Sequence, residues 1–159
     1  MRSLFVVLMG LLCILPVQAL DQYAGIGSYN NGLFVHYQLG NQYGNIELRA
    51  GQFFQMNNNI DVNLSVRRYI EQDANTDGFF VGGFAGQVNV SQIDVKQYRD
   101  VGAGFEMGYQ WVSKYTKTEF YGGMGINRAL SYGAVTQKAQ PAFLLGLSIG
   151  LDLHAFHKR

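Results

Sequence analysis

Hydrophobic and polar residues alternate strictly near the C-terminal end of the chain, between Phe143 and Leu153. One set of alternate positions is large and apolar: Phe143, Leu145, Leu147, Ile149, Leu151 and Leu153. The other set is mostly glycine, small polar or ionisable: Leu144, Gly146, Ser148, Gly150, Asp152 and His154. A period of two is that of a β-strand, because successive side chains point to opposite faces. A strand with this apolar face must pack against either a protein core or lipid.

Similar patterns predict seven further strands upstream, separated by turn residues. The expected strands cover residues 23–29, 33–39, 45–54, 60–67, 80–90, 101–111 and 119–127. The two faces of the first of these strands cannot be assigned from the pattern, because the strand is short and rich in glycine. Asn30-Asn31-Gly32 is a hairpin turn signal, and we expect longer polar loops over 91–97 and 130–140. No run of about twenty apolar residues follows Ala19, so the sequence predicts no membrane-spanning helix there.

Eight strands joined by connections short enough for hairpins predict an all-β fold, an eight-stranded antiparallel up-and-down transmembrane β-barrel. An even number of strands places both chain ends on one side of the membrane. With the ends in the periplasm, we expect turns near Asn41, 71–77 and Lys114 on that side. The outward loops are then expected near Asn30, near Asn57, and over 91–97 and 131–140.

The small-residue face of the strands indicates a barrel lumen rather than a surface in water. Glycines on a water-exposed face weaken a strand, whereas in a narrow lumen they make room for a few long side chains. By parity the charged residues also fall on this face, and we expect a structural polar network there formed by Glu47, Arg49, Asp61, Arg67, Glu106, Glu119 and Asp152. Opposite charges can pair across strands inside a barrel and offset the cost of desolvation. The sequence therefore predicts that bulky apolar residues of each strand face lipid.

Composition supports this interpretation. The chain has 20 glycines, 14% aromatic residues and only 2 prolines, which suits a closely spaced β-structure with aromatic girdles. Aromatic residues lie near the ends of the segments, where interface belts occur: Tyr37, Phe54, Tyr109, Trp111 and Phe143. The net charge of +1 gives no electrostatic reason to expect nucleic-acid binding.

Residues 1–19 resemble a cleaved signal peptide. Arg2 provides a positive start, residues 4–15 are apolar, and Val17-Gln18-Ala19 is typical of a cleavage site. An uncleaved N-terminal anchor is the alternative. The chain has one cysteine, Cys13, so the expected mature domain, residues 20–159, has no disulfide.

Several glycine-aromatic motifs resemble those of a known family. They are Gly78-Phe79-Phe80-Val81-Gly82, Gly104-Phe105-Glu106-Met107-Gly108-Tyr109-Gln110-Trp111 and Glu119-Phe120-Tyr121-Gly122-Gly123-Met124-Gly125, together with residues 145–153. Over roughly residues 43–153 the chain is similar to small outer-membrane β-barrel proteins of the DUF3575 type, within the broad OmpA/OmpX-like group of eight-stranded barrels. The resemblance implies a fold and a bacterial outer-membrane location, but no reaction, ligand or functional residue. Such barrels typically end on an aromatic residue, whereas here Phe156 is followed by His157-Lys158-Arg159.

The chain carries little sign of catalytic chemistry. His36 falls on the lumen face, where we expect a hydrogen bond, and His154 and His157 lie at the expected periplasmic end. No G-x-S-x-G motif or metal-spaced cluster appears. Asp152 and His154 suit a rim pair better than a metal site, and the loop containing Asp73 and Asp77 has too few ligands for an EF-hand. Glu106 and Glu119 are expected to approach each other, with Arg49 or Arg67 preventing acid-base catalysis. We therefore expect no catalytic, cofactor-binding or metal-binding residue.

Three functions remain for a membrane barrel. The first is a non-enzymatic structural or interaction protein with a packed lumen, whose loops contact partners or ligands. The second is an enzyme that modifies lipid A or phospholipid, and the third is a narrow pore. A soluble, lipocalin-like ligand-binding barrel is the alternative outside the membrane. For the first function we expect a monomer whose partners are outer-membrane lipid and lipopolysaccharide, and the barrel assembly machinery during insertion.

Overall fold

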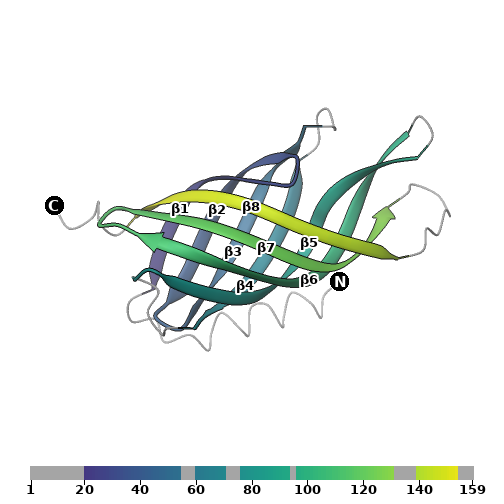
Figure 1. Ribbon diagram of the computed structural model, residues 1–159. Helices are drawn as coiled ribbons and strands as arrows, with labels where there is room; N and C mark the ends of the chain where they lie inside the picture. Colours follow the sequence, from purple (N-terminus) through teal and green to yellow (C-terminus); the bar gives the residue numbers. More distant parts are fainter. Residues whose placement is uncertain (1–19, 55–59, 71–75, 94–95, 131–138, 154–159) are drawn as a thin grey trace, which may run out of the picture.

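The computed structural model describes residues 20–54, 60–70, 76–93, 96–130 and 139–153, which form a closed antiparallel barrel of eight strands (Figure 1). The strands are β1 (Asp21–Tyr29), β2 (Gly32–Asn41), β3 (Gly44–Phe53), β4 (Asp61–Tyr69), β5 (Gly78–Ile93), β6 (Lys96–Val112), β7 (Thr116–Leu130) and β8 (Gln140–Asp152). The described ranges contain no helix, and hence none able to cross a membrane.

Each strand pairs with its neighbours in chain order, and β1 pairs with β8 to close the barrel. The expected all-β, eight-stranded, up-and-down arrangement is therefore confirmed. We call the end at which β1 begins and β8 ends the proximal end, and the opposite end the distal end. The turns after Asn41 and Val112 lie at the proximal end, and the turn at Asn30 lies at the distal end.

The apolar faces of most strands point outward. Phe105 is 80% exposed, Leu147 is 53% exposed and Ile149 is 47% exposed, whereas Ser148 between the last two is buried. Exposed large apolar residues occur on all eight strands. Because the polar and charged side chains lie inside, the molecule has the reverse of the usual arrangement of a water-soluble protein.

β5 departs from the rule that bulky apolar residues face outward. Phe80 is fully buried and Phe84 is nearly so, and both point into the lumen. The outward positions of this strand include Phe79 and Val81, so both faces of β5 carry large apolar residues. The prediction of one apolar face per strand is wrong for β5, because a narrow barrel must fill its interior and here uses aromatic rings to do so.

The predicted polar loop over 91–97 is also wrong, because most of these residues belong to strands. β5 continues to Ile93 and β6 starts at Lys96, with Ser91 paired to Tyr98 and Gln92 to Gln97. This hairpin projects from the distal end of the barrel (Figure 1). Beyond the barrel wall, a strand no longer has one face toward the lumen and the other toward the outside. Backbone pairing can therefore continue where apolar and polar residues stop alternating. The loop expected over 130–140 also begins and ends in strand, at Leu130 and Gln140.

Candidate functional site: a packed, charged lumen

Arg67 of β4 is the centre of an ion-pair cluster in the middle of the lumen. Its Nη2 lies 2.8 Å from Glu47 Oε2 on β3, and its Nε lies 2.5 Å from Glu106 Oε1 on β6. Its Nη1 donates to Glu119 Oε2 on β7 at 2.7 Å. One guanidinium therefore links three carboxylates from three other strands, and all four residues are buried.

Arg49 and His36 extend this cluster. Arg49 Nη2 donates to Glu47 Oε2 at 2.6 Å and lies 3.3 Å from Glu106 Oε2. His36 places Nδ1 3.1 Å from Glu47 Oε1 and Nε2 3.2 Å from the carbonyl oxygen of Ile149. Glu47 thus contacts three basic side chains, which holds β2, β3 and β4 in one network.

Basic side chains face every carboxylate of the cluster. The carboxylates of Glu47, Glu106 and Glu119 face the cations of Arg49, Arg67 and Lys117. A buried charge is costly unless it is paired and hydrogen-bonded, so the pairing offsets the desolvation of all six groups.

Aromatic rings cover the two guanidinium groups of the cluster. Arg49 lies over the ring of Tyr121 at 4.4 Å, and Arg67 lies over Phe80 at 4.4 Å. These distances are within the range of cation–π attraction. The rings also displace water from around the charges.

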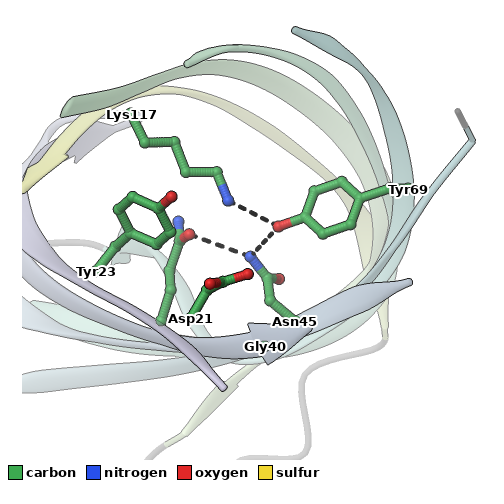
Figure 2. Close-up of a pocket in the computed structure, with 7 residues that line it drawn as sticks. Asp21, Tyr23, Gly40, Asn45, Tyr69 and Lys117 are labelled. Atoms are coloured by element: carbon green, nitrogen blue, oxygen red, sulfur yellow. Dashed lines mark hydrogen bonds between the residues drawn. The ribbon is translucent and has the colours of Figure 1, made fainter. Parts of the chain in front are cut away.

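A second polar layer lies in the proximal part of the lumen (Figure 2). Lys117 Nζ donates to Tyr69 Oη at 2.7 Å, and Asn45 Nδ2 lies 2.8 Å from Tyr69 Oη and 3.1 Å from Gln38 Oε1. Lys117 also lies over the ring of Tyr23 at 4.8 Å. These groups surround a cavity of about 10 Å³, which is room for about one water molecule.

An aromatic and aliphatic layer fills the distal part of the lumen. Tyr29 stacks on Phe34 with ring centroids 4.1 Å apart, and Phe53 packs edge-on against both. Tyr29 Oη donates to the carbonyl oxygen of Gln87 at 2.8 Å, and Asn30 Nδ2 donates to that of Val88 at 2.7 Å. The end of β1 is therefore hydrogen-bonded to β5 on the other side of the barrel, which narrows the lumen at this level.

Glycines opposite the lumen rings make this packing possible. A Cβ at Gly108 would lie 2.5 Å from Cζ of Phe80, and one at Gly146 would lie 2.4 Å from Cζ of Tyr121. A Cβ at Gly32 would meet the ring of Phe34 at 2.4 Å. The glycines predicted to make room in the lumen thus adjoin its largest side chains.

The seven residues expected to form the lumen network occupy different levels of the barrel. Glu47, Arg49, Arg67, Glu106 and Glu119 form the central cluster described above. Asp61 is buried near the distal end, 3.2 Å from Nε of Arg99, and Asp152 is half-buried at the proximal end of β8. Arg67 donates hydrogen bonds to both Glu106 and Glu119, the two carboxylates expected to approach each other.

Sequence reasoning did not identify several members of the network. Gln38 donates to Glu119 at 2.8 Å, Ser65 bonds to Glu106, and Lys117 lies 3.6 Å from Glu119. The sequence did contain a signal for them, because residues two apart on a strand lie on the same face. Lys117 shares a face with Glu119 in this way, and Ser65 with Arg67. Asn45 and Ser148 also join the network, as neighbours of Gln38 and Glu119.

The residues considered for catalysis do not form an accessible site in the described part of the chain. His36 is only 5% exposed, and its ring faces Glu47 and the backbone of β8. His154, His157 and Asp73 lie outside the described residues. Asp77 accepts a hydrogen bond from the backbone of Val112 at 2.6 Å. Within the described ranges no three His, Cys, Asp or Glu residues are grouped as a metal site.

Comparisons of the chain with protein-family models, with curated proteins and with solved structures find no match.

Proposed function

We propose that the chain is an exported protein that inserts into a bacterial outer membrane as a non-enzymatic barrel with a plugged lumen. It contributes to the cell envelope as a structural protein, and its distal hairpins and loops contact partners outside the cell. The resemblance to the DUF3575-type barrels implies the same location.

One observation carries this proposal: large apolar side chains cover the outside of the closed barrel on all eight strands. Water-soluble monomers rarely expose contiguous apolar patches of more than a few hundred Å². Where the barrel is closed, each strand is paired on both sides, so its backbone groups are satisfied in a solvent that cannot hydrogen-bond. Lipid is the surrounding medium that suits both features.

The dimensions of the shorter strands agree with an outer membrane. β2 and β3 have ten residues each. A strand of this length, tilted by about 40° and rising about 3.3 Å per residue, spans about 25 Å, which equals the usual height of the apolar band. Tyr109 packs against Phe79 and Trp111 on the outer face near the proximal end, as side chains of an interfacial aromatic belt do.

The packed lumen favours a structural role over a pore. Ion-paired side chains fill its middle, rings fill its distal part, and the cavity in its proximal layer has a volume of about 10 Å³. An eight-stranded interior is just wide enough for side chains to fill. An ion entering this interior would have to break the buried ion pairs.

The other two alternatives require features that the barrel lacks in its described part. A lipid-modifying enzyme using His36 needs that side chain at the rim, whereas it is buried against Glu47. A lipocalin-like barrel needs an apolar interior that can hold a ligand. This interior instead contains three carboxylates, two guanidinium groups and the amino group of Lys117. Both observations support the structural proposal.

Cell fractionation and gel electrophoresis test the proposal. The mature protein is expected in the outer-membrane fraction, and it is expected to migrate differently before and after boiling, because a closed barrel resists detergent until heated. Recovery from the periplasm without detergent would overturn the proposal.

Two functional assays distinguish the alternatives. We expect no single-channel conductance in a planar bilayer and no turnover of labelled lipid A or phospholipid. Conductance would favour the pore, and lipid turnover abolished by His36→Ala would favour the enzyme. With both assays silent, deletion of a distal loop is expected to produce an envelope or partner-binding phenotype.

A further inference from the structure

An apolar groove runs over the outer face of the barrel near the proximal end, across β2, β3 and β4. Its volume is about 460 Å³, and its apolar floor is formed by Leu39, Ile46 and Val66. These three residues are direct neighbours across the strands, because Leu39 pairs with Ile46 and Ile46 pairs with Val66. The groove is therefore part of the face that we assign to lipid.

The next row of residues toward the proximal end contains a glycine and a basic side chain. Asn41 pairs with Gly44, and Gly44 pairs with Arg68. Gly44 lines the groove, and a Cβ there would lie 2.2 Å from the carbonyl oxygen of Arg67. The close approach of the β4 backbone thus requires glycine at this position. Tyr43, in the adjoining turn, is exposed and also lines the groove.

Arg68 places a cation at the proximal end of this groove. Its side chain is exposed, unlike that of the adjacent Arg67, which is buried in the lumen. Among the described residues, none forms an ion pair with Arg68. A long basic side chain at the edge of an apolar band reaches toward the headgroups, where a lipid phosphate can pair with it.

We propose that this groove binds one phospholipid with an anionic headgroup, whose acyl chain lies along Leu39, Ile46 and Val66 and whose phosphate contacts Arg68. Charge complementarity selects the headgroup, and the apolar floor selects a lipid over a free phosphate. The hydroxyl of Tyr43 is an additional donor at the same end. Since β1 begins and β8 ends at the proximal end, the proposed orientation places this lipid in the periplasmic leaflet.

This inference rests on the proposed membrane insertion, so its test begins with an inserted barrel. The protein is reconstituted into vesicles of equimolar phosphatidylcholine and phosphatidylglycerol, and insertion is verified by the shift in migration on heating. It is then extracted into a neutral detergent, and the lipids that remain bound are counted by native mass spectrometry. Arg68→Gln removes the cation, Val66→Trp fills the groove, and Arg128→Gln is the matched control, because Arg128 is exposed near the distal end of β7.

We expect one retained phosphatidylglycerol per barrel in the parent and in Arg128→Gln. Loss of a charged hydrogen bond should reduce retention in Arg68→Gln about tenfold or more. Val66→Trp should also reduce retention, and inorganic phosphate added in place of the lipid should not bind. If the barrel inserts but retains the two lipids equally, the lipid site alone is overturned. Undiminished retention in an inserted Arg68→Gln barrel would overturn it too. Failure of the parent to insert would overturn the proposed function together with it.

Discussion

At the scale of single residues, the position of a side chain relative to the barrel wall determines its role. Arg67 and Arg68 are adjacent in the chain, yet the first contacts three buried carboxylates and the second is exposed outside. Two glycines show the same contrast, because a Cβ at Gly108 would clash with a lumen ring, whereas one at outward-facing Gly122 would make only ordinary contacts. Substitutions at neighbouring positions should therefore have very different effects.

Replacement of Arg67 by methionine is expected to destabilise the barrel by about 3–5 kcal/mol, because it leaves buried carboxylates without their shared cation. The free energy of unfolding is measured by urea titration of the protein refolded in a neutral detergent. The matched control, Arg68→Met, should change it by no more than about 0.5 kcal/mol. Similar losses in the two variants would contradict the assignment of Arg67 to the centre of the network.

Replacement of Gly108 by alanine is expected to cost about 1–3 kcal/mol, because the added methyl group overpacks the lumen. Its Cβ would lie 2.5 Å from both the carbonyl oxygen of Phe120 and Cζ of Phe80. Gly122→Ala is the control, since its Cβ would meet nothing closer than 3.6 Å. The two unfolding midpoints are compared in the same detergent, and a normal midpoint for Gly108→Ala would show that the lumen is loosely packed.

At the scale of the strands, β5, β6 and β7 are longer than the others and extend past the distal end. β5 pairs with β4 only as far as Gly86, where a positive φ of 138° precedes a bulge between Gln87 and Asn89. Beyond this point β5 is paired with β6 in a hairpin that leaves the barrel wall. In the proposed orientation this hairpin lies outside the cell.

An epitope inserted between Asp94 and Val95 is therefore expected to bind antibody on intact cells without loss of heat-modifiable migration. The same epitope between Ser113 and Lys114, in the proximal turn where Ser113 donates to Thr116, should bind only after the outer membrane is permeabilised. Whole-cell immunofluorescence with and without permeabilisation provides the measurement. The opposite pattern of exposure would reverse the proposed orientation.

The strand pattern explains which parts of the fold were predictable from the sequence. The strict alternation in β6 and β8 reveals both the strand and its two faces, since one face is apolar and the other is rich in glycine. In β5 both faces carry large apolar residues, so parity does not show that Phe80 and Phe84 point inward. The strand ends at Ile93 and Lys96 were missed because pairing outside the apolar band imposes no alternation.

For the lumen network, the sequence indicated which side of the barrel wall a residue faces, but neither the full membership nor the contacts. Parity places Glu47, Arg67 and Glu119 inside the barrel. Their pairing depends on the stagger of β3, β4 and β7, which brings residues far apart in sequence to one level of the lumen. That stagger is fixed by closure of the whole barrel, and no local pattern encodes it.

At the scale of the whole molecule, the barrel combines a charged, filled interior with an apolar exterior. The interior holds the strands together through ion pairs and ring packing, because the exterior contributes no hydrophobic core of its own. In the proposed location, lipid surrounds the apolar side chains of the exterior and keeps them from water. The proposed location, the expected lack of conduction and the proposed lipid site all depend on this reversed arrangement.

Cysteine scanning of β8 tests this arrangement most directly, since the chain has one native cysteine, Cys13, which lies in the expected leader. Leu147→Cys, Ser148→Cys and Ile149→Cys are spin-labelled after unfolding and reconstituted into vesicles. We predict that labels at positions 147 and 149 collide with lipid-dissolved oxygen but not with a water-soluble nickel chelate, and that the label at 148 is shielded from both. High accessibility of positions 147 and 149 to the nickel chelate would contradict it.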